Sequence, residues 1–238
     1  AAKSVFPFGP PFNYTDTWGK GWIFAIDSVG VIKWEWESEL NEETIIMGLK
    51  KTDDGGYLIA GAKNFSFAPD TMRFAVHKIW SDGEIAWRKT YGGNAEAGFT
   101  EIIKSPDGSG FILAGLEYTY NTDNPRVSWG VMAKIDNDGC MLWKRNYQSA
   151  QDGVQSGKFN HIKATPDGGY IVVGKGRRDD STFQNGWAIK TDEWGCVEPG
   201  CQYVVTSDCD GTTPIDEVIQ KEVKIKIFPN PFNDIVTF

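Results

Sequence analysis

Few residues of this chain are suited to acid–base chemistry. The sequence contains two histidines, His77 and His161, which fall in different predicted strands. A lone histidine in a strand is more often structural than catalytic. Glu101 and His161 occupy matching places in two predicted inner strands, so these two would matter if the chain were an enzyme. Because there is no nucleophile elbow, phosphate loop or zinc-binding histidine pair, we predict no catalytic residue.

Two acidic segments have part of the spacing of a calcium loop. They are Asp136–Gly139 and Asp208–Gly211. Neither is followed by a glutamate at the spacing that such a loop requires. We interpret the first as a turn between strands, whereas weak Ca²⁺ binding and a polar linker explain the second equally well. No other cofactor or metal is expected.

The four cysteines suggest a disulfide rather than a metal site. Cys196 and Cys201 enclose Val-Glu-Pro-Gly, which can turn tightly enough to bring two Cβ atoms into bridging range. We predict a disulfide between them, and a secreted setting favours it over two free thiols. Cys140 and Cys209 could pair or stay free. Because no histidine lies near these cysteines, a zinc site is not favoured.

Charge and hydropathy exclude two classes of partner. The 238 residues carry 24 Lys+Arg and 32 Asp+Glu, for a formal net charge of −8. An acidic chain without a basic stripe is not suited to nucleic acid, because binding phosphates requires clustered positive charge. The longest apolar runs are far too short to span a bilayer. Since no signal segment opens the chain at Ala1, either a signal was removed or this is an internal fragment.

The elements that position these residues come from a repeat. One repeated phrase is a turn followed by an apolar run, at Asp54–Gly61, Asp107–Gly115 and Asp167–Gly174. The other is an apolar strand, a turn glycine and a tryptophan four residues later, seen at Gly30/Trp34, Gly83/Trp87 and Gly139/Trp143. A fourth copy keeps Gly195 but has Pro199 in place of the tryptophan. Each phrase predicts a β-hairpin.

Two hairpins make a four-stranded unit. In the second unit we predict strands at Thr44–Thr52, Gly56–Ala62, Arg73–Trp80 and Glu84–Tyr91. The second strand is apolar at consecutive positions, which indicates cover on both faces. The last strand alternates, with Ile85 and Trp87 separated by Ala86, which is typical of an outer strand.

The repeat predicts an all-β fold, a β-propeller built of four-stranded antiparallel blades. A β-sandwich also has many short strands, but it gives no reason for a fixed period. We expect Trp34, Trp87 and Trp143 to pack between blades rather than to bind a ligand, because a single site would need its ring only once. We expect a partial blade at 1–38 and blades at 39–93, 94–149 and 150–202, about three and a half in all.

Closed propellers contain roughly four to eight blades. The three and a half blades expected here are therefore too few to form a closed ring. We favour further blades that precede this sequence. The alternative is that Tyr203–Thr206 or Val223–Phe228 completes the first blade in a ring of four. After the blades we expect a polar linker at 203–221.

The last segment, 222–238, has a recognisable pattern. An alternating strand at Val223–Ile227 precedes Phe228, Pro229, Asn230 and Pro231, and Ile235-Val236 begins another strand. This segment resembles the start of the β-sandwich-like C-terminal sorting domain carried by type IX secretion substrates of Bacteroidota. Thr52–Gly61 and Thr165–Gly174 likewise resemble propeller repeats common in such proteins. The hairpin with its tryptophan also resembles the tryptophan-docking repeat of quinoprotein propellers, which we interpret as shared packing.

The resemblance implies where the protein acts and what exports it. The expected location is secreted or at the cell surface, on the outer face of the outer membrane. The type IX secretion machinery is the implied partner, with Phe228, Pro229, Asn230 and Pro231 as the sorting signal.

Long connections between the second and third strands of each unit are the expected ligand face. These connections are Lys63–Met72, Glu117–Ser128 and Lys175–Gly186, with Phe6–Trp18 as the equivalent in the first unit. Long loops are more often functional than tight turns. Their rings and arginines suit a glycan or protein ligand, although ordinary solvated loops would explain them about as well. The candidate residues are Phe65, Phe67, Tyr118, Tyr120, Arg126, Arg177, Arg178 and Phe183.

Three functions follow from these patterns. We favour a secreted or cell-surface binding or adhesion module, because the loop face is asymmetric and no catalytic constellation is present. The first alternative is part of an enzyme acting on extracellular polysaccharide, with its site in the propeller channel. The second alternative is a structural spacer or surface-layer protein without a ligand.

Overall fold

The computed structural model describes residues 2–4, 21–38, 44–63, 72–92, 97–119, 127–147, 157–177, 184–198 and 201. These residues form antiparallel β-sheets joined by turns, and no helix is assigned among them. Nothing in this part of the chain is therefore a helix long and apolar enough to cross a membrane. The all-β prediction is confirmed. The predicted linker at 203–221 and sorting segment at 222–238 lie outside the described residues.

The strands form four sheets that follow one another along the chain. The first sheet has the order β1 (Ala2–Ser4), β2 (Gly21–Ile26), β3 (Ile32–Glu37). The second has the order β4 (Thr44–Lys51), β5 (Tyr57–Lys63), β6 (Arg73–Ile79), β7 (Ile85–Tyr91). The third has the order β8 (Ala97–Lys104), β9 (Phe111–Thr119), β10 (Val127–Ile135), β11 (Met141–Tyr147). The fourth has the order β12 (Gly157–Ala164), β13 (Tyr170–Arg177), β14 (Gln184–Thr191).

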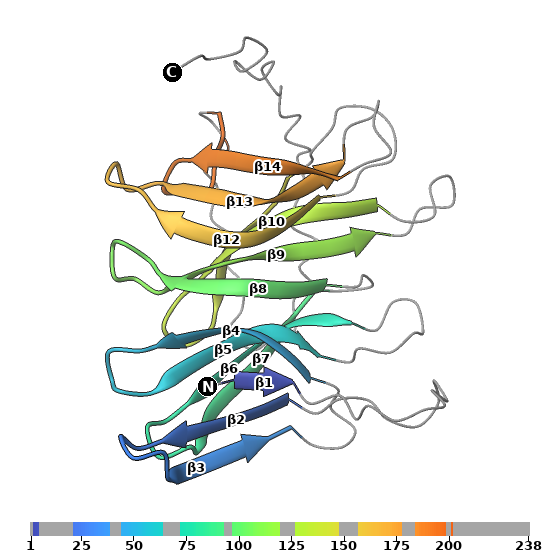
Figure 1. The fold of residues 1–238 in the computed structure, drawn as a ribbon. Helices are drawn as coiled ribbons and strands as arrows, with labels where there is room; N and C mark the ends of the chain where they lie inside the picture. Colours follow the sequence, from blue (N-terminus) through green and yellow to red (C-terminus); the bar gives the residue numbers. More distant parts are fainter. Residues whose placement is uncertain are drawn as a thin grey trace, which may run out of the picture.

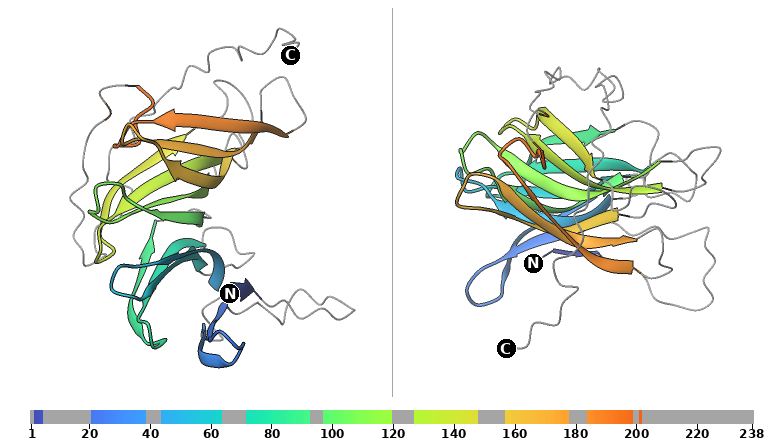
Figure 2. Two further views of the ribbon diagram at one scale, coloured as in Figure 1. Left: turned by 60° about the vertical axis from the view of Figure 1, so that its left-hand side comes forward. Right: turned by 90° about the horizontal axis from the view of Figure 1, so that it is seen from above.

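The sheets stack in chain order, from the first at the bottom of Figure 1 to the fourth at the top, and Figure 2 shows the same stack from two further sides. Each hydrophobic core joins two successive sheets. Ile23 and Ile79 belong to the core between the first and second sheets, and Phe74 and Phe99 stack between the second and third. Phe159 belongs to the core between the third and fourth. The middle sheets are therefore covered on both faces.

The strands predicted for the second unit correspond to β4–β7 within one residue at each end. Strand β5 is buried from Leu58 to Ala62, as its continuous apolar run predicted. The fourth sheet lacks an outer strand in the described residues, which agrees with the proline that replaces the tryptophan of that strand. Sequence analysis did not predict β1, a short strand that pairs with β2 through Ala2 and Ile23.

The predicted alternation of Ile85 and Trp87 on one face is wrong. The register of β6 with β7 shifts so that Lys78 lies opposite Trp87 and Ile79 opposite Ile85, which leaves Ala86 as an extra residue. A β-bulge of this kind re-aims the following side chain. Ile85 therefore packs toward the first sheet, whereas Trp87 packs toward the third. The same shift precedes Trp34 and Trp143 in the other hairpins.

The three tryptophans occupy equivalent places between sheets, as predicted. A Cβ atom added to Gly83 would lie 2.8 Å from the ring of Trp34. One added to Gly139 would lie 2.8 Å from Trp87, and one added to Gly195 would lie 3.0 Å from Trp143. Each ring thus packs on the turn glycine of the following sheet. These glycines have φ between +75° and +97°, a backbone conformation that disfavours any residue with a side chain. The ring packed on each glycine also leaves no room for a side chain.

Candidate functional site

One end of the molecule carries tight turns that are held by carboxylates. In the turn between β4 and β5, one oxygen of Asp54 accepts hydrogen bonds from the Thr52 hydroxyl at 2.5 Å and the Gly56 amide at 3.0 Å. Asp107 and Asp167 accept the same pair of bonds in the turns between β8 and β9 and between β12 and β13. These bonds explain why the repeat places Thr or Ser two residues before each Asp.

A lysine on the third strand of each of these sheets forms an ion pair with the turn aspartate. The Nζ of Lys78 lies 2.7 Å from Asp54, that of Lys134 lies 2.7 Å from Asp107, and that of Lys190 lies 2.8 Å from Asp167. Sequence analysis missed these lysines. Their repetition in the sequence could have identified them, because each lysine is the penultimate residue of its strand, β6, β10 or β14.

The ion pairs and turn hydrogen bonds lower the pKa values of the aspartates. The bond from Lys78, followed by those from Thr52 and Gly56, lowers the pKa of Asp54 to about 2. Partial burial works to raise the pKa of Asp107, but the bonds from Lys134 and Ser105 outweigh it and lower the pKa. The two aspartates therefore stay ionised near neutral pH. Because the same pair recurs in the second, third and fourth sheets, we interpret it as structural rather than catalytic.

A cavity of about 240 Å³ opens at this turn end between the second and third sheets. Its charges are already paired, because Lys78 contacts Asp54 and Lys104 forms an ion pair with Asp53. The cavity can take a small polar molecule, but it offers no unpaired acid or base of its own. Its lining residues are Thr52, Asp53, Asp54, Leu58, Lys78, Lys104, Gly108, Phe111 and Asn137.

The structure brings together the two residues that sequence analysis assigned to an enzymatic alternative. Nδ1 of His161 on β12 lies 3.6 Å from Oε2 of Glu101 on β8. The same Glu101 oxygen accepts a hydrogen bond from the Ile162 amide. The imidazole is 76% exposed and Glu101 is 32% exposed. Each residue directly follows a bulge in its strand, at Thr100 and Asn160. At 3.6 Å the two side chains lie close to each other without a direct hydrogen bond between them.

No cluster of three metal-ligating side chains occurs in the part of the chain that the structure describes. Asp136–Gly139 is the predicted turn, in which Asp136 accepts hydrogen bonds from the amides of Asp138 at 2.9 Å and Cys140 at 2.8 Å. Asp208–Gly211 lies outside the described residues. His77 is buried and meets the ring of Trp36 edge-on, with 5.6 Å between ring centres.

The end opposite the turns is where the long connections leave the sheets. Lys63 pairs with Arg73, Thr119 with Val127, and Arg177 with Gln184, so the three connections depart from corresponding strand ends. These strand ends lie on the right in Figure 1, and the tight turns lie on the left. Tyr118 is half-buried on β9. Arg177 ends β13, and the other candidates of this face lie outside the described residues: Phe65, Phe67, Tyr120, Arg126, Arg178 and Phe183.

A buried ion pair anchors the strand end beside the Glu117–Ser128 connection. Nζ of Lys144 lies 2.9 and 2.7 Å from the two Glu117 oxygens, and the Asn146 amide donates to Glu117 at 2.9 Å. The Glu117 and Lys144 side chains are only 7% and 9% exposed. The Lys144 Nζ also lies 5.5 Å from the ring centre of Phe74 in the second sheet. Sequence analysis missed this cluster, because its members come from different strands.

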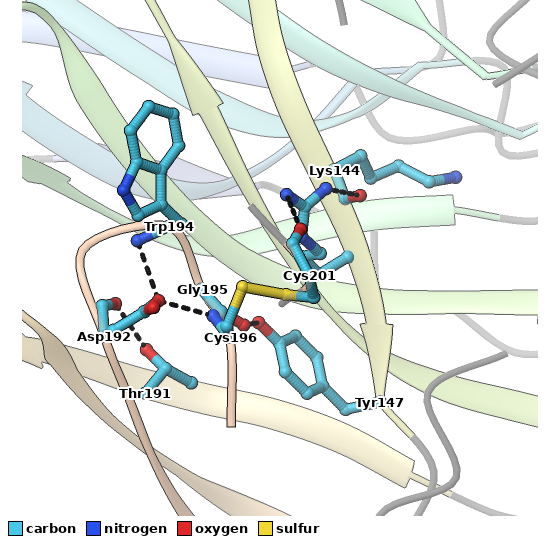
Figure 3. Close-up of a disulfide and its surroundings, with 9 residues drawn as sticks. Lys144, Tyr147, Thr191, Asp192, Trp194, Gly195, Cys196 and Cys201 are labelled. Carbon is cyan, nitrogen blue, oxygen red and sulfur yellow. Dashed lines mark hydrogen bonds between the residues drawn. A yellow bond between two sulfur atoms is a disulfide. The ribbon is translucent and has the colours of Figure 1, made fainter. Parts of the chain in front are cut away.

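The predicted disulfide between Cys196 and Cys201 is confirmed, with Cα atoms 5.7 Å apart (Figure 3). The Cys201 carbonyl accepts a hydrogen bond from Nη2 of Arg145 at 3.0 Å, so the bridged loop is tied to β11. Cys140 is also disulfide-bonded. Cys209 lies outside the described residues, as do Phe228, Pro229, Asn230 and Pro231.

No protein-family model matches the chain, and no curated protein matches it. Among solved structures it is similar to a crystal structure of a protein of unknown function from Bacteroides caccae. The two share 11% identity over 74% of this chain and 72% of the other, with a TM-score of 0.31. A score this low transfers neither a fold nor a function.

Proposed function

We propose that the four sheets are blades of a β-propeller. Three features support this arrangement: each sheet follows the previous one in the chain, each core joins two successive sheets, and each tryptophan packs on the turn glycine of the next sheet. Equivalent contacts at every step are what a radial repeat requires. A crystal structure of the intact protein tests the proposal, because successive sheets must be related by one common rotation.

The propeller serves as a secreted or cell-surface module that binds a glycan or a protein. The observation that carries this function is the asymmetry of its two ends. Turns at one end are short and fixed by Asp54, Asp107 and Asp167. Connections at the other end are long and contain aromatic and arginine residues, and the buried Glu117–Lys144 pair anchors the strand end beside one of them. A rigid scaffold that presents long loops is a common binding architecture.

Binding by the long-connection end can be tested with the whole chain on a glycan array and in partner pull-downs. For any ligand found in these screens, the double variant Tyr120→Ala and Arg126→Ala is expected to bind at least about tenfold more weakly than the unaltered chain. Aromatic rings and arginines contribute most of the binding energy in such interfaces. The matched control is Asp82→Ala and Asp138→Ala, in two exposed turns at the other end. A ligand that is lost with the turn variants and kept with the loop variants would contradict the proposal.

Export by type IX secretion rests on the resemblance at Phe228, Pro229, Asn230 and Pro231. The chain produced in a Bacteroidota host is expected to reach the cell surface, where added protease digests it. In a strain without the secretion machinery it should stay protected. Surface delivery that continues in that strain would refute this route.

Catalysis on an extracellular polysaccharide is the second candidate, and the 3.6 Å approach of His161 to Glu101 favours it. A carboxylate beside an exposed imidazole can supply a proton donor and acceptor. If a hydrolytic activity is found in the intact protein, His161→Ala and Glu101→Ala should each reduce kcat by about a hundredfold or more. Unchanged rates in both variants would remove this candidate.

A further inference from the structure

The cavity between the second and third sheets has a charged opening and an apolar floor. Asp53 and Asp54 of the β4–β5 turn and Lys104 of β8 line it with side chains that are 81%, 46% and 43% exposed. Leu58 and Phe111 also line it, but they are only 1% and 4% exposed. A molecule that enters the cavity therefore meets polar groups first and apolar side chains below them, which is the usual lining of a small-molecule site.

At the equivalent place between the third and fourth sheets, a side chain of the protein occupies this position. Tyr170 begins β13 as Phe111 begins β9, and each pairs with the last residue of the preceding strand. Tyr170 is buried and its side chain interacts with Ser105, the third-sheet counterpart of Thr52. Phe111 has no hydroxyl group to direct toward Thr52. The cavity therefore has room, beside Thr52, for a hydroxyl group that a ligand supplies.

The polar groups at the opening are specific to this pair of sheets. Asp53 and Lys104 lie on either side of it, and Asn137 of the β10–β11 turn is exposed and also belongs to its lining. The counterparts of Asp53, Lys104 and Asn137 at the next step of the repeat are Pro106, Ala164 and Glu193. The repeat thus preserves the turn, whereas the donors and the exposed carboxylate at the opening are particular to this cavity.

One of the two ion pairs in the lining is fixed and the other can rearrange. Nζ of Lys78 donates to Thr52 at 2.5 Å and to both oxygens of Asp54 at 2.7 Å, and the Lys78 side chain is only 7% exposed. The pair of Asp53 with Lys104 joins the two sheets, and both of its side chains are exposed. Because exposed ion pairs contribute little free energy, Asp53 and Lys104 can replace their mutual contact with bonds to a ligand.

A neutral ligand with several hydroxyl groups suits this lining better than an ion. An anion would meet two carboxylates, and a cation would meet two ammonium groups. A hydroxyl group both donates and accepts hydrogen bonds. It can therefore donate to the carboxylate of Asp53 or Asp54 and accept from Lys104 or Asn137, while C–H groups of the ligand pack on Phe111.

The volume of the cavity limits the size of the ligand. It measures about 240 Å³, which is below the roughly 300–1,000 Å³ of sites for drug-sized molecules. We propose that this cavity binds a single sugar residue, either as a free monosaccharide or as the terminal residue of a glycan. The site lies at the turn end of the molecule and does not depend on the binding proposed for the long-connection end.

Saturation-transfer difference NMR on the whole chain tests the site with glucose, galactose, mannose and N-acetylglucosamine as probes. Each sugar is compared with its methyl glycoside, which mimics the terminal residue of a glycan. Binding of the free sugar alone identifies a monosaccharide site, and binding of both identifies a site that also accepts a glycan end. Acetate and methylammonium are the charged comparison probes.

Two variants place the bound sugar in the cavity. Phe111→Tyr introduces the hydroxyl group that Tyr170 has at the next step, and it should weaken sugar binding at least about tenfold because it occupies the same space. Tyr170→Phe is the matched control and should leave binding unchanged. Lys104→Met removes a charged donor and should also weaken binding at least about tenfold. Its control is Lys163→Met, at an exposed lysine of β12.

Circular dichroism and the melting temperature of each variant confirm that it folds. Sugar binding that is weakened in Phe111→Tyr and Lys104→Met and kept in both controls establishes the site. The proposal is overturned if none of the sugars binds, if a charged probe binds more tightly than every sugar, or if both cavity variants bind as the unaltered chain does. Binding that is lost only in the double variant Tyr120→Ala and Arg126→Ala would also overturn it, but would support the function proposed for the long-connection end.

Discussion

The hydroxyl of Tyr147 donates a 2.6 Å hydrogen bond to the carbonyl of Gly195, which joins the end of β11 to the turn after β14 (Figure 3). Tyr91 makes the same bond to Gly139 one unit earlier, also at 2.6 Å. Both tyrosines are buried, and burial raises the pKa of Tyr91 above its ordinary value. The bond accompanies the tryptophan–glycine contact at these two steps between sheets.

Removal of this hydroxyl should destabilise the stack. Tyr147→Phe leaves the buried Gly195 carbonyl without its donor, which costs about 1–3 kcal/mol of unfolding free energy. Urea denaturation measures the loss. Tyr57→Phe is the control, because its half-buried ring makes no such bond to a neighbouring sheet in the described structure. Equal losses in the two variants would show that the inter-sheet bond contributes nothing.

The turn glycines should tolerate a methyl group only where no ring lies above them. Gly168 and Gly139 both have positive φ, but a Cβ at Gly168 meets nothing within 4 Å. Gly168→Ala should cost about 1–2 kcal/mol through the backbone alone. Gly139→Ala should cost about 1–3 kcal/mol more, because its methyl clashes with Trp87.

The extra cost at Gly139 has a direct check. Combining Gly139→Ala with Trp87→Phe should cost less than the sum of the two changes, since the smaller ring makes room for the methyl. Denaturation of the four proteins in the cycle measures this coupling. Strict additivity would mean that the ring and the glycine do not contact each other in solution.

Acid should weaken the turns that Asp54, Asp107 and Asp167 hold. The pKa of Asp54 falls from an ordinary 3.8 to about 2 on folding, so its contribution is complete above the unfolded value and is lost as pH falls toward the folded value. Unfolding free energy should therefore decrease between about pH 4 and about pH 2. Replacing all three aspartates with Asn should reduce this slope, and urea titrations across the range measure it. A slope that is unchanged in the triple variant would refute the assignment.

The buried pair of Glu117 and Lys144 should be costly to break and cheap to replace. Lys144→Met leaves an uncompensated buried carboxylate, which costs about 3–5 kcal/mol. Adding Glu117→Leu should recover part of that loss. The control is Lys104→Met at the exposed Lys104–Asp53 pair, which should change stability by less than about 1 kcal/mol. Denaturant unfolding measures all of these variants, and a double variant worse than Lys144→Met would contradict the account.

The sequence alone determined the strands, their hairpins and their repetition. Asp-Gly turns and continuous apolar runs act over a few residues, so Asp54–Gly61 and its two copies can be recognised locally. The Cys196–Cys201 disulfide was predicted for the same reason, because its two ends lie close in the chain.

Only the tertiary structure decided which sheet each side chain meets. A one-residue bulge moves Trp87 to the opposite face from Ile85, and period-two alternation cannot show it. The pairing of Lys78 with Asp54 and of Lys144 with Glu117 depends on strands that are adjacent in space and distant in sequence.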